Sequence, residues 1–170
     1  PESAGQARAG RIVRVNGEAH GGSGVLADLV EMVWLIPAMD GLFTGPAGDR
    51  RRFLDRLILC FDPGYRTRLG HFERAMTSRN RLLSDGIRDR AQFESLERIM
   101  AETGVAMAAA RADAVAALAA TIEARRERNA DSPFPWASLA LDGAIEAALV
   151  ARAAVDVEDD YFKTLQVNRE

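Results

Sequence analysis

The chain has 170 residues, of which 48% are hydrophobic and 28% charged, and its net charge is −3 at neutral pH. This composition is ordinary for a soluble globular protein, and no apolar run approaches the roughly 18 residues that span a membrane. The acidic balance means that any nucleic-acid contact must come from a local basic patch. The chain does not begin with Met and opens on a polar lead-in, residues 1–10, without a signal peptide, so we expect an excerpt or a processed product.

The single cysteine and the single lysine narrow the possible chemistry. Cys60 lies in an apolar stretch and is predicted to be buried; alone it forms no intrachain disulfide or cysteine metal site, which favours a reducing, cytoplasmic setting. The only lysine, Lys163, has no neighbouring glycine, so these residues lack the Gly-x-x-x-x-Gly-Lys-Ser/Thr phosphate loop. His20 and His71 have no ligand cluster at metal-binding spacing, and no nucleophile with a partner base is visible.

The predicted β structure is confined to the first 36 residues and one later segment. Residues 11–15 alternate polar and apolar before Asn16-Gly17, the strongest short hairpin signal, and predict a strand. Residues 18–23 are glycine-rich and turn-like, and 25–30 could form a short helix. The apolar run 33–36, stopped by Pro37, predicts a buried strand. Residues 136–141 alternate enough to predict one further strand.

Two helices are predicted after a structured loop at residues 37–49. The first begins with Asp49 as its N-cap and places three arginines in its first turn, against the helix dipole; Arg51 can pair with Asp55, four residues on. The second covers residues 65–83, and its apolar seam includes Arg79. A guanidinium in such a seam must be paired or must face a ligand, because an unpaired buried charge is too costly.

A much longer helix is predicted for residues 89–129, about 60 Å if unbroken, with Gly104 as the expected kink. Its second half is rich in alanine, which favours helix and lets another helix approach closely. We expect this helix to pack antiparallel against the helix at 65–83 or against a neighbouring chain. After a breaker at 131–135, two short helices are predicted at 143–153 and 157–169.

The arginines provide the strongest functional signal, because they can form a basic surface that meets phosphates. The alternative is that they pair with nearby carboxylates or face water, and the pattern alone slightly favours that alternative. The arginines on the two helices are Arg50, Arg51, Arg52, Arg56, Arg66, Arg68, Arg74, Arg79 and Arg81. Asn80 adds hydrogen-bond donors and acceptors beside Arg79.

The same region holds an ordered set of short motifs. The motifs are Trp34-Leu35-Ile36-Pro37 with Asp40, Gly45-Pro46, Arg50-Arg51-x-Phe53-Leu54-Asp55, Asp62-Pro63-x-Tyr65 and Arg79-Asn80-x-Leu82-Leu83. This ordered set resembles the central part of the RecF family of bacterial DNA replication and repair proteins, which are ABC-type, SMC-like ATPases. The resemblance covers almost the whole chain from residue 11 onward.

The resemblance implies an α+β, mostly helical fold: a small β remnant of an ABC-type ATPase lobe with an antiparallel helical arm, or lid, domain. Residues 1–45 would end the first lobe, 46–130 would form the arm, and 131–170 would return toward the second lobe. The segment at 37–40 would correspond to a Q-loop, although the usual glutamine is missing there, so a metal-ligand or cofactor-binding role for Asp40 is a hypothesis. The phosphate loop, signature motif and Walker B aspartate would lie outside these residues.

The resemblance further implies a parent that uses ATP and Mg to dimerise, clamps duplex DNA near single-strand gaps and loads recombinase with RecO and RecR in the SOS response. Such a protein is cytoplasmic and nucleoid-associated, without a membrane partner. This chain by itself is expected to be non-catalytic and without a cofactor. Arg50, Arg51, Arg52 and Asp55 are predicted to contact DNA phosphate or to order the junction between head and arm, with Arg79 and Asn80 bracing it. The alternative is a stand-alone helical module that binds a protein partner.

Overall fold

The structure is a computed structural model that describes residues 12–21, 24–27, 29–30 and 32–169. It divides into two compact units, Pro1–Met39 and Asp40–Glu170, and each is described here by itself. The predicted boundaries near residues 45 and 130 stay predictions. The second unit contains all of the long helices, so the positions of the candidate site residues from Arg50 onward depend on it alone.

The first unit contains a β-hairpin of two antiparallel strands, β1 (Val13–Val15) and β2 (Glu18–His20). Asn16 and Gly17 both have positive φ, 52° and 90°, as a two-residue type I′ turn requires. The strand and hairpin signal predicted from the sequence is confirmed, although Arg11 lies outside the described residues. The turn-like prediction for 18–23 is wrong at its start, because residues 18–20 pair with β1.

The predicted buried strand at 33–36 is wrong. After the short helix α1 (Gly24–Ala27), these residues are extended but pair with no strand, and Val33 and Leu35 are 39% and 70% exposed. A strand needs a neighbour to accept its backbone hydrogen bonds. In the described part of the chain the only sheet is the β1–β2 hairpin, and its strands pair only with each other. The apolar run at 33–36 alone was therefore not enough to predict a strand.

The second unit begins with turns and the helix α2 (Ala47–Ile58), which follows the 3-10 helix η1 (Pro37–Met39) that closes the first unit. Pro46 occupies the N-cap, so the prediction of Asp49 as N-cap is wrong by three residues. Asp49 instead lies in the first turn, where its charge suits the helix dipole. Arg51 and Arg52 lie beyond the first turn of α2, and not within it as predicted. Cys60 lies in the turn after α2 and is half-buried, not buried as predicted.

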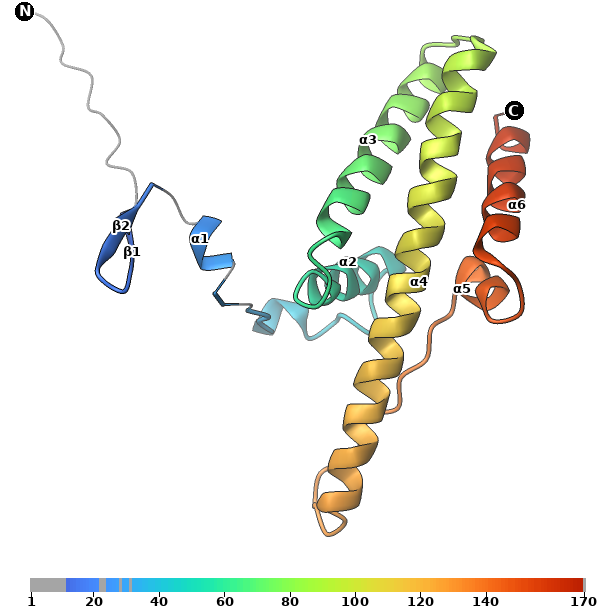
Figure 1. Ribbon diagram of the computed structural model, residues 1–170. Helices are drawn as coiled ribbons and strands as arrows, with labels where there is room; N and C mark the ends of the chain where they lie inside the picture. Colours follow the sequence, from blue (N-terminus) through green and yellow to red (C-terminus); the bar gives the residue numbers. More distant parts are fainter. Residues whose placement is uncertain (1–11, 22–23, 28, 31, 170) are drawn as a thin grey trace, which may run out of the picture. The chain divides into compact units, whose positions relative to one another are not determined.

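Two long antiparallel helices, α3 (Tyr65–Ser84) and α4 (Arg90–Arg128), form the centre of the second unit (Figure 1). Their predicted bounds and antiparallel packing are confirmed. A short turn joins them, with Gly86 at a φ of 66°. Asp89 caps α4 by accepting a hydrogen bond from the backbone N–H of Gln92 at 3.1 Å. The second half of α4 extends beyond α3 (Figure 1).

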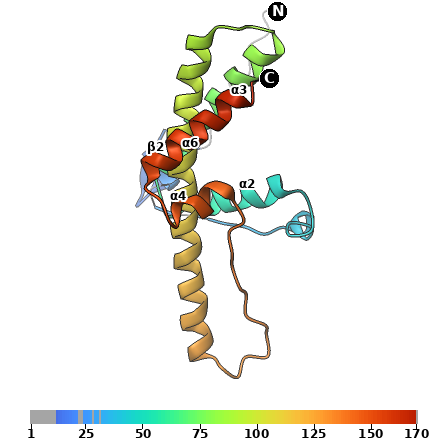
Figure 2. The ribbon, with the colours of Figure 1, turned by 90° about the vertical axis from the view of Figure 1, so that its right-hand side faces the viewer.

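Two shorter helices, α5 (Ala144–Leu149) and α6 (Ala154–Val167), pack back onto α4, which agrees with the two helices predicted there. The predicted strand at 136–141 is wrong, because these residues form an extended connection without a partner strand. Figure 2 shows this connection beside the second half of α4 and α6 crossing its first half. The core contains Ile58, Tyr65 and Met107 in one cluster and Ala75, Met100 and Leu165 in another.

Gly104 is where α6 and α3 approach α4 most closely. The predicted kink is wrong, since α4 continues as one helix through this residue. A Cβ at Gly104 would lie 3.0 Å from Tyr161 Cε1 and 3.2 Å from Phe72 Cε2. The glycine therefore serves helix packing, because only a residue without a side chain lets both rings reach the helix backbone.

One helix in the described residues, α4, is long and apolar enough to cross a membrane by length and composition alone, with a window of mean hydropathy 1.6. The sequence analysis counted uninterrupted apolar runs and found none of this length. The finding is weak evidence, because helices at the centre of soluble proteins pass the same test. The helix also carries Glu97 and Arg111, whose charged groups pair with other helices of this unit.

We expect Gly104→Leu to lower the free energy of unfolding by about 1–3 kcal/mol, because the new side chain overpacks the contact with Tyr161 and Phe72. The matched control is Ala116→Leu, an exposed position on the same helix, which should change it by less than about 0.5 kcal/mol. Urea unfolding followed by circular dichroism measures both. Equal stability of the two variants would contradict the packing role of Gly104.

Candidate functional site

Three of the predicted site residues, Arg50, Arg51 and Arg52, lie exposed on α2. Arg50 Nη1 donates to the Gly45 carbonyl oxygen at 2.7 Å, which ties the helix to the loop before it. Arg52 pairs with Asp49 within the same helix, and both side chains are largely exposed. Within the described ranges no hydrogen bond or ion pair involves the Arg51 side chain. Arg51 is thus a cation available to a ligand from solvent.

Asp55, also on α2, is buried and only 8% exposed. Arg111 on α4 donates two hydrogen bonds to the Asp55 carboxylate, from Nε to Oδ1 at 2.9 Å and from Nη2 to Oδ2 at 3.1 Å. The Tyr65 hydroxyl on α3 donates to the same carboxylate, and Glu146 on α5 lies 3.8 Å from Arg111 Nη1. The predicted pairing of Asp55 with Arg51 is wrong, because in the described residues the Asp55 carboxylate pairs with Arg111 and Tyr65 instead.

The Asp55 cluster, consisting of Asp55, Tyr65, Arg111 and Glu146, keeps Tyr65 protonated and Arg111 charged. Burial and the hydrogen bond to Asp55 raise the pKa of Tyr65 well above its ordinary value, so its hydroxyl stays a donor. Burial alone would lower the pKa of Arg111, but the Asp55 carboxylate outweighs it and raises that pKa. This cluster joins four helices and is a structural junction.

Arg79 lies in a second buried cluster, with Glu97 and Arg169. Its Nε donates to Glu97 Oε1 at 3.0 Å, and its Nη2 donates to the carbonyl oxygens of Leu165 at 2.7 Å and Asn168 at 3.2 Å. Arg169 also pairs with Glu97 and stacks over the Phe93 ring at 5.1 Å. The prediction that the seam guanidinium is paired is confirmed, and Arg79 caps the last turn of α6.

Glu97 has no exposed side-chain surface, yet it is a carboxylate. Burial alone would raise the pKa of Glu97, but hydrogen bonds and charge from Arg169 and Arg79 outweigh it and hold that pKa below its ordinary value. Arg169 responds reciprocally, since its hydrogen bond to Glu97 raises the pKa of the guanidinium. The Glu97 cluster, consisting of Arg79, Glu97 and Arg169, therefore binds α3, α4 and the end of α6 together.

The remaining predicted residues, Asn80 and Asp40, are exposed. Asn80 lies on α3 next to Arg79 of the Glu97 cluster, and Asp40 lies in the turn that opens the second unit. The structure thus does not gather the predicted site into one pocket, because Asp55 and Arg79 belong to separate clusters that share no residue. Sequence reasoning missed Arg111, Glu97 and Arg169; the only signal was that Arg79, in an apolar seam, needed a partner.

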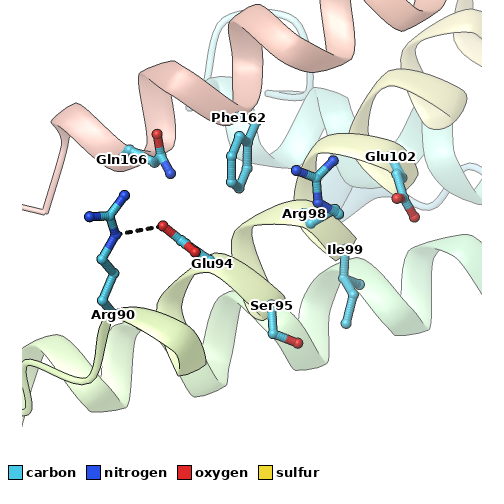
Figure 3. A pocket seen from close by; sticks show the side chains of 8 residues that line it. All are labelled: Arg90, Glu94, Ser95, Arg98, Ile99, Glu102, Phe162 and Gln166. Carbon is cyan, nitrogen blue, oxygen red and sulfur yellow. Dashed lines mark hydrogen bonds and ion pairs between the residues drawn. The ribbon is translucent and has the colours of Figure 1, made fainter.

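The structure also has a shallow, polar groove of about 610 Å³ between α4 and α6. Arg98 stacks on the Phe162 ring at 4.7 Å, and Arg90 pairs with Glu94 at 2.7 Å on its rim (Figure 3). Glu102 and Gln166 also line it. Among the described residues no three histidine, cysteine or acidic side chains gather as a metal site.

Comparison with known proteins shows that the chain resembles bacterial DNA replication and repair proteins. It is 49% identical over 168 residues to a protein of Mesorhizobium japonicum, covering 99% of this chain and 44% of that protein. It is 46% identical to proteins of Brucella suis and Rhizobium etli, covering 98% of this chain and 42% and 43% of theirs. The chain spans less than half of the length of these relatives.

Each of these relatives is named DNA replication and repair protein RecF. The chain therefore resembles RecF over nearly its whole length, and this confirms the resemblance that the motifs indicated. The covered share of the relatives is consistent with a central segment. No family model matches the chain. No solved structure matches it either.

We expect Glu97→Gln to lower the free energy of unfolding at pH 7 by about 3–5 kcal/mol, because it leaves two buried guanidinium groups without their carboxylate. The matched control is Glu94→Gln on the same helix, whose exposed pair with Arg90 contributes less than about 1 kcal/mol. Denaturant unfolding of both variants measures the difference.

Comparing the wild-type protein with Glu97→Gln at several pH values tests the pKa of Glu97. Because this pKa is lowered in the folded state, the stabilisation is present above the ordinary value of 4.5 and is lost as pH falls through the folded value. The stability difference between wild type and Glu97→Gln should shrink below about pH 4.5, by at most about 1.4 kcal/mol per pH unit. A difference that does not change with pH in this acid range would contradict the lowered pKa.

Asp55→Asn should also cost about 3–5 kcal/mol, since Arg111 would stay buried without its counter-ion. Tyr65→Phe removes only one hydrogen bond from the same cluster and should cost about 1–2 kcal/mol. Thermal and urea unfolding give the order of the two effects. A larger loss from Tyr65→Phe would mean that the Arg111–Asp55 pair is not the main contact of the cluster.

Proposed function

We propose that this chain is a segment of a RecF-like, ABC-type DNA repair ATPase that binds duplex DNA near single-strand gaps and aids recombinase loading. The observation that carries this proposal is 46–49% identity over 98–99% of the chain to proteins named DNA replication and repair protein RecF. ATP and Mg would bind to motifs outside these residues, and dimerisation on ATP would bring two copies together around DNA. RecO and RecR would be its protein partners, in the cytoplasm at the nucleoid.

Within this proposal residues 46–130 are the arm, and the two buried clusters tie the arm to the helices in residues 131–170 through Glu146 and Arg169. The contacts of Arg79 with Glu97, Leu165 and Asn168 support a bracing role for that residue. The exposed α2 arginines support a contact with phosphate or with the head, because a buried side chain could not reach either. Asp40 remains a hypothesis for the Q-loop-like position, as the first residue of the second unit.

A helical module that binds a protein partner is the second candidate. It is favoured by an apolar groove of about 490 Å³ beside the alanine-rich half of α4, which includes Ile58, Phe61 and Leu118 in its lining. Phe61 is 63% exposed at its edge. A module of this kind would bind protein without a salt-dependent DNA signal.

The salt dependence of DNA binding tests the proposal. Binding of the 170-residue chain to a labelled gapped duplex should weaken linearly with salt on a double logarithmic plot, because phosphate contacts release counter-ions. Arg51→Gln should lower the slope by about 0.9, one phosphate contact, without lowering the melting temperature. Arg125→Gln, an exposed change of equal charge at the end of α4, serves as the control.

The outcomes separate the candidates. Binding to RecR without any salt-dependent DNA binding would favour the protein-binding module. The DNA sequence on both sides of this segment gives an independent check: a phosphate-loop motif upstream and a Walker B aspartate downstream support the ATPase, whereas their absence contradicts it.

A further inference from the structure

Helix α3 has one buried side and one solvent side that differ sharply in composition. The residues that pack inward, which include Tyr65, Ala75 and Arg79, lie on the side toward α4. At 100° per residue, the opposite side of the helix carries Arg66, Gly70, Arg74, Thr77 and Arg81. We call the three exposed arginines, Arg66, Arg74 and Arg81, the α3 arginine stripe.

The stripe is more basic than the chain as a whole. Helix α3 contains five arginines and a single acidic residue, Glu73, in a protein of net charge −3. Two of these arginines are committed elsewhere, Arg79 to the Glu97 cluster and Arg68 to Asp62. The other three form the stripe, with Glu73 at its edge.

The stripe arginines are available for an external anion. Within the described residues neither Arg66 nor Arg74 has an ion pair. Arg81 lies 3.5 Å from Asp85, but the two side chains are 83% and 50% exposed, so this pair contributes little and is readily replaced. The three guanidinium groups consequently carry net positive charge along one straight face.

The spacing of the stripe fits a regular polyanion. Arg66 and Arg74 are eight residues apart and Arg74 and Arg81 seven, which corresponds to about 12 Å and 10–11 Å along a helix. Phosphates that face each other across a groove of duplex DNA are separated by a similar distance, the major groove being about 12 Å wide. The Arg74 guanidinium lies over Gly70, where a Cβ would be 3.1 Å from Arg74 Nη1, so the missing side chain at this position gives that cation its place on the helix surface.

We propose that the α3 arginine stripe contacts the phosphates of duplex DNA. This inference rests on the proposed function and assigns the contact to a surface that the sequence analysis did not distinguish from the other arginines. The outward face has no aromatic side chain on which an unpaired base could stack, so it does not fit single-stranded DNA. The contact is independent of base sequence, because arginines that reach only phosphate carry no base readout.

The test compares two triple variants of equal charge in the 170-residue chain. The first is Arg66→Gln with Arg74→Gln and Arg81→Gln, and the control is Arg125→Gln with Arg126→Gln and Arg128→Gln at the end of α4. Binding to a labelled gapped duplex is measured at several salt concentrations. The stripe variant should bind at least about tenfold more weakly at low salt, with a salt slope smaller by about 2–3, and the control should stay near wild type.

A second variant separates contact from folding. Arg66→Lys with Arg74→Lys and Arg81→Lys keeps the charges and should retain most of the salt slope, because lysine also binds phosphate as a point charge. Circular dichroism should show unchanged helix content in all three proteins. If wild type binds DNA and both glutamine variants match each other, the stripe inference is wrong and the proposed function stands. If wild type shows no salt-dependent DNA binding, the proposed function itself fails.

Discussion

The arrangement of the second unit depends on a carboxylate that has been removed completely from water. Glu97 can stay ionised in this position only because Arg79 on α3 and Arg169, just after the end of α6, surround it. Pairing three charges in this way fixes the register of α3 and α6 against α4, because sliding either helix by one turn would leave a buried charge unpaired. The neighbouring apolar contacts, such as Met100 with Leu165, tolerate small shifts far better than this cluster does.

The buried clusters also explain why the arginines of this chain must be separated into two groups. Arg79 donates to Glu97 and Arg111 donates to Asp55, and these carboxylates neutralise the two positive charges inside the protein. Arg51, Arg66 and Arg74 project into solvent without such partners. Only the second group contributes to the field that an approaching polyanion meets. A simple count of arginines overestimates that field, and the overall charge of −3 underestimates it on one face of α3.

The long helices were predictable from the sequence because their signals are local. The residues Asp62-Pro63-Gly64 interrupt the helical pattern and Asp89 can cap a helix, so both starts are marked locally and the predicted ranges 65–83 and 89–129 nearly match α3 and α4. The strand at 33–36 was not predictable in this way, since a strand depends on a partner whose identity the run itself does not encode. The partners of the buried charges are equally non-local: Arg111 lies 56 residues from Asp55, and Leu165 lies 86 residues from Arg79. Sequence pattern could state only that Arg79 required a partner.

The exposed arginines of α3 lie toward solvent, and the buried arginines of the two clusters lie toward the neighbouring helices. A polyanion bound along α3 would apply its load to a helix whose inner side is held to α4 and α6 by the Glu97 cluster and to α2 by the Asp55 cluster. Because charged clusters that lack water resist small displacements, the load would move the helices together instead of bending α3 alone. The alanine-rich half of α4 extends beyond this braced region and has no such cluster in the described residues, so it is the part of the unit that can adapt to a partner without disturbing the rest.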